Sequence, residues 1–293
     1  MEIDQLRTFI SVARNAHVSR AARELHMAQP AVSRQIRELE RACGGVPLIE
    51  KVGRNVRLTE AGEALLIHAQ SILAEVAAAE STMRERLGLT AGRVSVGTPP
   101  SVGLHLLPDA LARFHRTYPA IELRIQQAGT AQLLHQLSMG EIDIAVVTLP
   151  IPSRGHDIIP LFIEPLVAVF HEGHSLAARN EISINELSDE AFLLYPSGYE
   201  MHEVIIKACR DAGFAPKIVL DGGDVAILLR LAAAGLGIAI VPKITIQGVE
   251  GIVARPIVRP LLSRSMALVT KSDRILTPPT RMLLHQLKQT LPQ

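Results

Sequence analysis

The most informative stretch of the chain lies at residues 18–45 and reads VSRAARELHMAQPAVSRQIRELERACGG. It predicts a short helix over Ser19–Leu25 and a longer helix over Gln29–Glu40, with only three residues between them. Two alanines, Ala21 and Ala22, allow the two helices to cross closely. Two helices joined by so tight a turn form a helix-turn-helix.

Apolar side chains of the longer helix recur with the helical period and predict one buried face, made of Val32, Ile36, Leu39 and Cys43. The opposite face carries polar and basic residues, namely Gln29, Ser33, Arg34 and Arg37. Such a helix can enter a major groove and contact phosphates and base edges. A helical hairpin with a solvated charged face is the alternative that this pattern alone leaves open.

Residues at the helix starts favour the same interpretation. We expect Ser19 to cap the first helix by accepting a hydrogen bond from an otherwise unpaired backbone N–H. Pro30 stands where the second helix would begin, and its fixed φ suits that position. An earlier amphipathic helix, opened by Asp4, should pack under this pair.

A short hairpin follows the helices, with one strand at 48–52, a Gly53-Arg54-Asn55 turn and a second strand at 56–58. Arg54 and Arg57 on this hairpin are placed to reach a minor groove or the neighbouring phosphates. A helix-turn-helix followed by a basic hairpin is a winged module, which we assign to residues 1–58.

The distribution of charge supports a nucleic-acid partner for this module. Residues 1–58 carry ten Lys or Arg against six Asp or Glu, whereas residues 93–293 carry eighteen of each sign. A positive excess confined to one segment is typical of a surface that binds phosphates. Aromatic residues make up only 3% of the chain and Trp is absent, so base stacking on a single strand is disfavoured.

Other classes of protein find little support. No run of about 18 apolar residues exists, and the N-terminus lacks a signal pattern, so we expect a cytoplasmic protein without membrane contact. Catalytic motifs of the Gly-x-Ser-x-Gly or phosphate-loop type are missing, and Gly235-Leu236-Gly237 precedes a strand-like run rather than a helix. We therefore expect no enzyme activity, no catalytic residue and no cofactor.

The spacing of the cysteines and histidines does not predict a metal site. Cys43 and Cys209 are expected to be buried structural thiols, with a redox pair as the alternative. The run His171-Glu172-Gly173-His174 lacks the spacing of a one-face zinc motif and predicts a polar loop.

A long helix is predicted over residues 59–88, capped by Thr59. Apolar residues on it alternate steps of four and three and form a heptad seam, namely Leu65, Ala69, Ile72, Val76, Ala79 and Met83. The seam predicts pairing with a second copy of the chain. An amphipathic helix lying on its own domain is the alternative. Residues 89–92 are expected to form a hinge.

From residue 93 to 293, strand and helix patterns alternate, which is typical of parallel sheets covered by helices. We expect one lobe from residues 93–165 and 266–293, and a second lobe from residues 166–265. Two lobes joined by two crossings form a hinged clamp, in which ligands lie at strand ends facing helix N-termini.

Taken together, these residues resemble the LysR-type transcriptional regulators over nearly the whole chain. The N-terminal signature is the specific part: Ser19, Ala21-Ala22, Leu25, Gln29-Pro30-Ala31-Val32-Ser33, Gln35-Ile36, Leu39-Glu40, Gly45, Pro47-Leu48 and Leu58-Thr59-Glu60-Ala61-Gly62. The second half is consistent with it through Tyr118-Pro119, Gly140, Asp143, Gly235-Leu236-Gly237-Ile238-Ala239 and Pro242.

The resemblance implies an α/β protein with an N-terminal winged helix-turn-helix, a long linker helix and a two-lobed effector domain like a periplasmic binding protein. It implies a homotetramer, built as a dimer of dimers, that binds an inverted repeat in promoter DNA and affects access of RNA polymerase. The DNA-binding residues it implies are Gln29, Pro30, Ser33, Arg34, Arg37, Arg54 and Arg57.

We assign a small effector to the cleft between the lobes. Hydroxyl groups and helix N-termini converge at this cleft, so we expect the effector to be anionic. The expected effector-binding residues are Pro100, Ser101, Val102, Thr130, Thr148 and Ser197, and Ser101 is also expected to cap its helix. The acidic run Asp221-Gly222-Gly223-Asp224 is left outside this set, as a turn or a cation contact. The alternative is a DNA-binding regulator whose C-terminal domain only oligomerises and answers to no small molecule.

Overall fold

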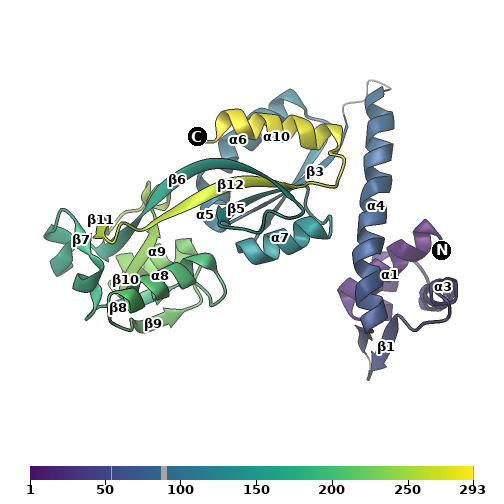
Figure 1. Ribbon diagram of the computed structural model, residues 1–293, viewed down its shortest axis with the longest axis horizontal. Coiled ribbons are helices and arrows are strands. Elements are labelled where there is room, and N and C mark those ends of the chain that lie inside the picture. Colours follow the sequence, from purple (N-terminus) through teal and green to yellow (C-terminus); the bar gives the residue numbers. More distant parts are fainter. Residues whose placement is uncertain (54, 87–90, 293) are drawn as a thin grey trace. The chain divides into compact units, whose positions relative to one another are not determined.

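The computed structural model describes residues 1–53, 55–86 and 91–292. The chain divides into two compact units, one built on the N-terminal residues and one on the residues that follow the long helix. The elements of the first unit are α1 (Ile3–Asn15), α2 (Val18–Glu24), α3 (Gln29–Ala42), β1 (Ile49–Val52), β2 (Asn55–Leu58) and α4 (Glu60–Arg86). They confirm the predicted helix-turn-helix, hairpin and long helix (Figure 1).

One apolar core holds the N-terminal unit together. Phe9 of α1 and Val32 and Leu39 of α3 have no exposed surface, and Ile36 is 2% exposed. The predicted apolar face of α3 is therefore confirmed, with Cys43 half-buried at its end. Burying this face on α1 leaves the opposite face of α3 on the surface.

Details of the helix starts differ from the sequence predictions. Ser19 does not cap α2; that helix begins one residue earlier, and the Nδ1 atom of His17 accepts a hydrogen bond from the Ser19 N–H at 3.2 Å. Pro30 is the second residue of α3 rather than the first, and α1 begins at Ile3, before Asp4. The Thr59 cap is confirmed, since its hydroxyl accepts from the Gly62 N–H at 3.0 Å.

The seam of α4 has two environments. Ala69 is fully buried and Leu65 is half-buried, and both pack against the N-terminal core. Further along the helix, Ile72 is 40% exposed and Met83 is 54% exposed. The later part of the seam therefore presents apolar side chains to solvent in the single chain.

The second unit begins with lobe I, whose sheet has the order β4-β3-β5-β12-β6. Its strands are β3 (Gly92–Thr98), β4 (Ile121–Gln127), β5 (Ile144–Leu149), β6 (His156–His171) and β12 (Ser263–Lys271). Its helices are α5 (Pro100–His105), α6 (Leu107–Thr117), α7 (Thr130–Ser138) and α10 (Pro278–Thr290). Strands β4, β3 and β5 are parallel as predicted, while β12 and β6 run antiparallel to their neighbours.

Lobe II has the sheet order β9-β8-β10-β6, with β11 and β7 added beyond β6. Its strands are β7 (Ile182–Ser183), β8 (Ala191–Leu194), β9 (Lys217–Asp221), β10 (Ile238–Pro242) and β11 (Ile252–Arg259). Its helices are α8 (Glu200–Asp211), α9 (Val225–Ala233) and the short η1 (Ser175–Ala178), η2 (Ile184–Leu187) and η3 (Lys243–Ile246). Strands β7, β8 and β11 were not among the predicted elements.

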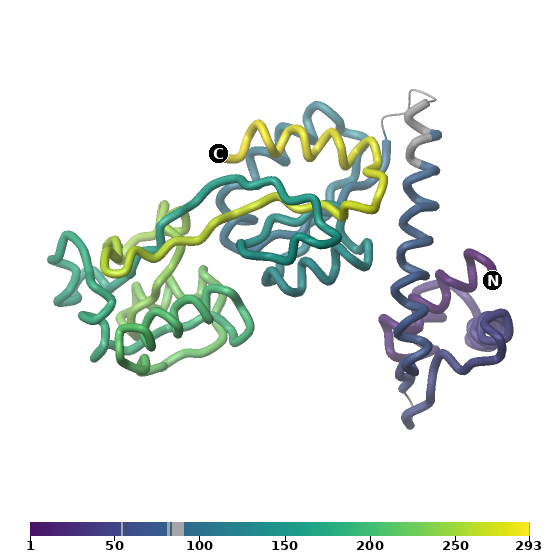
Figure 2. Tube along the Cα trace, viewed as in Figure 1, coloured from purple at the N-terminus to yellow at the C-terminus, as the bar shows by residue number. Residues whose placement is uncertain are grey.

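Strand β6 belongs to both lobes. Residues 156–165 pair with β12 of lobe I, and residues 166–171 pair with β10 and β11 of lobe II. Figures 1 and 2 show β6 and β12 running side by side as the two connections between the lobes. The two strands therefore form the hinge between the lobes of the predicted clamp. The separate hinge predicted at residues 89–92 lies partly outside the described residues, and Gly92 already belongs to β3.

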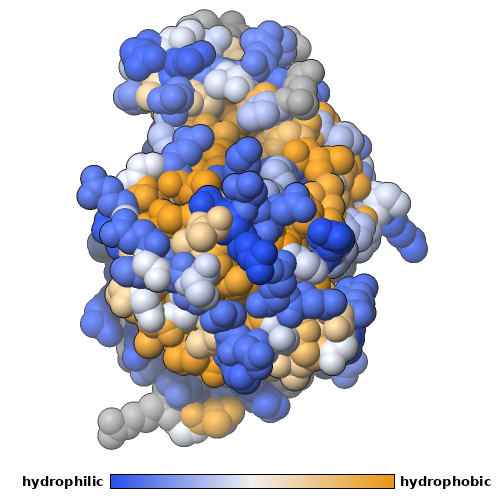
Figure 3. Space-filling model, turned by 90° about the vertical axis from the view of Figure 1, so that its left-hand side faces the viewer, coloured by the Kyte–Doolittle hydropathy of each residue, from blue (hydrophilic) through white to orange (hydrophobic). Residues whose placement is uncertain are grey.

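The surface of the second unit is mixed. Figure 3, which faces the lobe II end, shows hydrophobic patches separated by hydrophilic side chains. The larger exposed apolar residues of this lobe lie on β9, on α9 and in two connecting loops, namely Ile218, Val219, Ile227, Leu236 and Leu261. Among the residues that the structure describes, no helix is long and apolar enough to cross a membrane.

Candidate DNA-binding surface and effector cleft

The predicted DNA-binding residues of α3 lie together on the face away from the core. Gln29, Pro30, Arg34 and Arg37 are exposed and Ser33 is half-buried. The Ser19 hydroxyl donates to Gln29 Oε1 at 3.0 Å, so α2 fixes the side chain that begins α3. The surface thus presents amide, hydroxyl and guanidinium groups from one helical face.

Two of the basic side chains have exposed acidic neighbours. Arg34 Nε lies 3.8 Å from Glu38 Oε1, one turn along α3, and Arg57 Nη2 lies 2.9 Å from Glu50 Oε1 across the hairpin. Exposed ion pairs contribute little free energy, so both guanidinium groups can exchange these partners for phosphate. Arg54, the other predicted hairpin contact, lies outside the described residues.

A cavity of about 50 Å³ opens between the two lobes at the hinge. Lobe I contributes the Pro99-Pro100-Ser101 loop and Thr148, and hinge strand β12 contributes Arg264. Lobe II contributes the remaining lining residues, which are Tyr195, Pro196, Tyr199, Glu200, Met201, Asp224 and Val225. Since a buried water needs about 10–15 Å³, the cavity has room for a small molecule.

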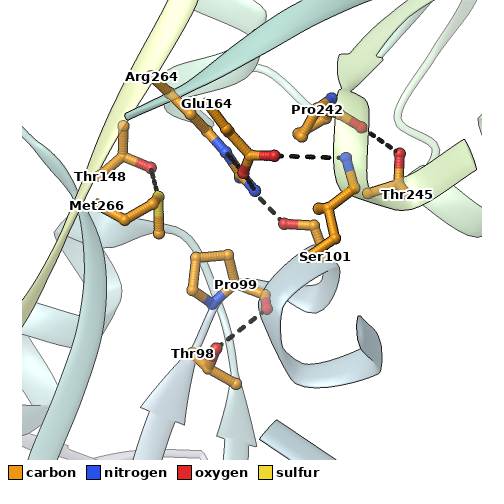
Figure 4. Close-up of polar contacts among 10 residues, drawn as sticks. Thr98, Pro99, Ser101, Thr148, Glu164, Pro242, Thr245, Arg264 and Met266 are labelled. Atoms are coloured by element: carbon orange, nitrogen blue, oxygen red, sulfur yellow. Dashed lines mark hydrogen bonds and ion pairs between the residues drawn. The ribbon is translucent and has the colours of Figure 1, made fainter. Parts of the chain in front are cut away.

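A buried ion pair closes the hinge side of this cavity. Arg264 Nε donates to Glu164 Oε1 at 2.7 Å, and the two side chains are only 3% and 9% exposed. Arg264 Nη1 also donates to the Ser101 hydroxyl at 3.0 Å, and the Ile244 N–H donates to Glu164 Oε2 at 3.4 Å (Figure 4). The pair is therefore bonded to lobe I through Ser101 and to lobe II through Ile244.

Two further hydrogen bonds organise the lobe I wall. The Thr148 N–H donates to the Thr130 hydroxyl at 3.1 Å, and the Thr148 hydroxyl lies 3.6 Å from Met266 Sδ. The Thr130 N–H, at the start of α7, donates to Glu200 Oε1 of lobe II at 2.5 Å. A carboxylate of the protein therefore occupies the helix N-terminus at which an anionic ligand was expected.

Tyr195 is the exception in this well-bonded site. The residue is 5% exposed, and its hydroxyl has no hydrogen-bond partner among the residues that the structure describes. Burial raises the pKa of Tyr195, and nearby Arg264 lowers it only in part. An unpaired buried hydroxyl costs free energy unless another molecule bonds to it.

The structure brings some of the predicted effector residues together. Pro100, Ser101 and Thr148 line the cavity. Thr130 lies behind Thr148, Val102 is fully buried, and Ser197 is exposed outside the lining. Ser101 lies inside α5 and makes no capping bond, so the predicted Ser101 cap is wrong.

Nine of the lining residues were missing from the predicted set, among them Tyr195, Glu200, Asp224 and Arg264. Asp224 belongs to the acidic run that was left outside the predicted set, and Tyr195 lies two residues before Ser197, which was included. Arg264 could not be predicted as a cleft residue, because nothing local in the sequence shows that it pairs with Glu164, one hundred residues away.

Neither cysteine lines the cavity. Cys209 is fully buried in the lobe II core, and burial raises the pKa of its thiol to about 11. In the described part of the chain, no group of three His, Cys, Asp or Glu side chains is placed to hold a metal ion.

Comparisons with known proteins agree with this architecture. The family model for the bacterial regulatory helix-turn-helix protein of the lysR family matches residues 3–63, and the LysR substrate binding domain matches residues 87–292. The transcriptional dual regulator GltC of Bacillus subtilis is 34% identical over 282 residues, covering 95% of this chain and 93% of its own. The DNA-binding transcriptional dual regulator OxyR of Escherichia coli is 30% identical, covering 99% and 95%.

A solved structure shows the same arrangement of elements. A full-length OxyR variant from Pseudomonas aeruginosa superposes with a TM-score of 0.76 at 26% identity, covering 99% of this chain and 97% of that one. A winged helix-turn-helix followed by a hinged two-lobed domain defines a DNA-binding transcriptional regulator with an effector-binding domain. The chain belongs to the LysR family of these regulators.

Proposed function

We propose that this regulator binds an inverted-repeat promoter site in the cytoplasm, with α3 of each copy in a major groove. The proposed contacts are Gln29, Pro30, Ser33, Arg34, Arg37 and, from the hairpin, Arg54 and Arg57. The exposure of this helix face and the positive excess of residues 1–58 support the proposal. The chain would act by binding rather than by catalysis.

Dimerisation through α4, and assembly of two dimers into a tetramer, is part of the same proposal. The exposed Ile72 and Met83 support it, because a partner helix would bury them. Two recognition helices about 34–36 Å apart would then contact successive turns of one duplex.

For the effector, we propose a small molecule with an acidic group, bound between the lobes by Pro100, Ser101 and Thr148. The observation that carries this proposal is the cavity itself, which both lobes and hinge residue Arg264 line together. A ligand that prefers one angle between the lobes shifts their population toward that angle. Such a shift would alter the DNA complex and the access of RNA polymerase.

The test uses the full chain and DNA duplexes that this chain selects by binding from a random library. Footprinting should show a protected palindrome, and a metabolite from a broad panel should change both the thermal midpoint and the DNA affinity. Ser101→Ala should weaken the response to that metabolite without weakening basal DNA binding. DNA affinity that no metabolite alters would favour a C-terminal domain that only oligomerises.

A further inference from the structure

The charges around the cleft do not suit a simple anion. Arg264 is the single Lys or Arg among the described lining residues, and the carboxylate of Glu164 bonds directly to it. Two further carboxylates, Glu200 and Asp224, line the same cavity. With Arg264 compensated, the lining has an excess of negative charge.

Both lining carboxylates keep capacity for a ligand. Glu200 is half-buried and accepts the Thr130 N–H at Oε1, while Asp224 lies at the exposed rim and accepts the Ile227 N–H at Oδ1, at 2.9 Å. Within the described residues, neither Glu200 Oε2 nor Asp224 Oδ2 accepts a hydrogen bond. A carboxylate accepts several hydrogen bonds, and a protonated amine offers three donors.

In this cleft the carboxylates lie close enough to the two tyrosines for their charges to shift the pKa of each tyrosine hydroxyl. Burial raises the pKa of Tyr199, and the charges of Glu200 and Asp224 raise it further, so both carboxylates act on one ring. Burial also raises the pKa of Tyr195, which feels Arg264, Glu164 and Asp224. The Tyr195 hydroxyl therefore stays protonated and can donate to a ligand oxygen.

We infer that the cleft binds a small zwitterion of the amino-acid class, with its ammonium group at Glu200 and Asp224 and its carboxylate at the Tyr195 hydroxyl. The inference rests on the proposed function, because it specifies the effector of the same cleft. The ammonium group of a zwitterion bonds to the lining carboxylates, and its carboxylate bonds to the unpaired Tyr195 hydroxyl. An acid without an amine would place its negative charge beside the carboxylates of the cleft. The cavity of about 50 Å³ favours the smaller members of this class.

Titration of the full chain with the standard L-amino acids tests the inference. The chain has no Trp, and two of its three tyrosines, Tyr195 and Tyr199, line the cleft, so tyrosine emission reports directly on binding. Each amino acid that binds is compared with the matched carboxylic acid without the amine, and with the matched amine without the carboxylate. We expect either deletion to weaken binding at least about tenfold, since a hydrogen bond to a charged group contributes about 1.5–3 kcal/mol.

Two isosteric variants locate the ammonium group. Glu200→Gln keeps an acceptor for the Thr130 N–H, and Asp224→Asn keeps a helix cap, so each removes only charge. Both should weaken amino-acid binding about tenfold or more and leave binding of the matched acid unchanged or stronger. Glu203→Gln on α8 and Asp221→Asn on β9 are the matched controls, because both residues are exposed and lie outside the cleft lining.

The results separate this inference from the proposed function. If the deaminated acids bind as well as the amino acids, or if both charge-removing variants bind amino acids normally, the ammonium site is wrong while an acidic effector stands. If no amino acid binds at millimolar concentration, the inferred class is wrong, and binding of another acid from the panel still supports the cleft. Unchanged urea unfolding of Glu200→Gln and Asp224→Asn, followed by tyrosine emission, shows that these variants fold.

Discussion

Glu164 and Arg264 are Cα partners across the antiparallel strands β6 and β12, and their buried side chains bond to each other at the hinge. Arg264 holds Ser101 of lobe I, and Glu164 holds the backbone of Ile244 in lobe II. Rotation of the lobes about the hinge must therefore lengthen or redirect at least one of these bonds. A change in the angle between the lobes therefore changes the hydrogen bonds of Arg264, which lines the cleft.

Removing one partner of this pair should destabilise the second unit strongly. Glu164→Leu or Arg264→Met leaves an uncompensated buried charge and should cost about 3–5 kcal/mol, whereas the double variant should cost less than either single one. Urea unfolding followed by tyrosine emission measures this, because all three tyrosines lie within residues 93–293. Arg124→Ala, which breaks the exposed Arg124–Glu122 pair, should cost less than about 1 kcal/mol. Additive single costs would contradict the coupling.

Loss of the Arg34 guanidinium should weaken DNA binding. If this exposed side chain contacts a guanine edge, Arg34→Ala should cost about 1–3 kcal/mol and relax sequence preference at one base pair. Gel-shift titration on a selected operator and on its single-base variants measures both effects. Arg41→Ala, at the last turn of α3, is the control. Unchanged affinity and unchanged preference would remove Arg34 from the contact set.

The Tyr195→Phe variant should be at least as stable as the natural chain. Within the described part of the chain the hydroxyl is buried without a partner, so its removal relieves a desolvation penalty of about 1–3 kcal/mol and leaves the ring packing intact. The same variant should bind effector more weakly. Urea unfolding and effector titration measure the two effects, and a clear loss of stability would mean that the hydroxyl has a bonding partner in solution.

Oxidation of Cys209 should play no part in DNA binding. At neutral pH a thiol whose pKa is about 11 is protonated, so Cys209 should resist peroxide and thiol reagents until the chain unfolds. Hydrogen peroxide should therefore not alter the DNA affinity of this chain through Cys209. Peroxide treatment followed by gel shift and thiol titration tests this, with Cys209→Ala as the control.

The same raised pKa predicts how stability depends on pH. Because the folded thiol ionises later than the unfolded one, Cys209 contributes stability that is present below about pH 8.5, where an exposed thiol ionises. That contribution is lost as the pH rises toward about 11. Thermal melting across this range should show alkaline destabilisation that Cys209→Ala reduces, and an equal pH dependence in both proteins would count against burial of the thiol.

Local patterns allowed most of the elements to be predicted. The helical period of Val32, Ile36 and Leu39 fixed the buried face of α3, and alternating strands and helices gave the two lobes. Capping of α2 was missed because His17, a less common cap, replaces Ser19 in that role. These errors move element ends by a residue and leave the architecture unchanged.

The cleft was harder to predict because its key contacts join distant parts of the chain. Hydroxyls near helix N-termini pointed to the Ser101 loop, which lines the cavity, yet Glu200 already fills the α7 N-terminus. The partner of Arg264 depends on the antiparallel register of β6 and β12, which neither strand encodes alone. Local sequence therefore located the pocket but did not give its charge balance.

The double connection through β6 and β12 also has a consequence for how such proteins diversify. The chain leaves lobe I after Pro165 and re-enters it at Ser263, and these two residues pair directly across the strands. The two ends of the lobe II segment therefore lie side by side. A foreign segment with equally close ends could replace it without distorting the rest of the molecule. Exchange of this segment between relatives would give sensors of new metabolites that still recognise the original operator.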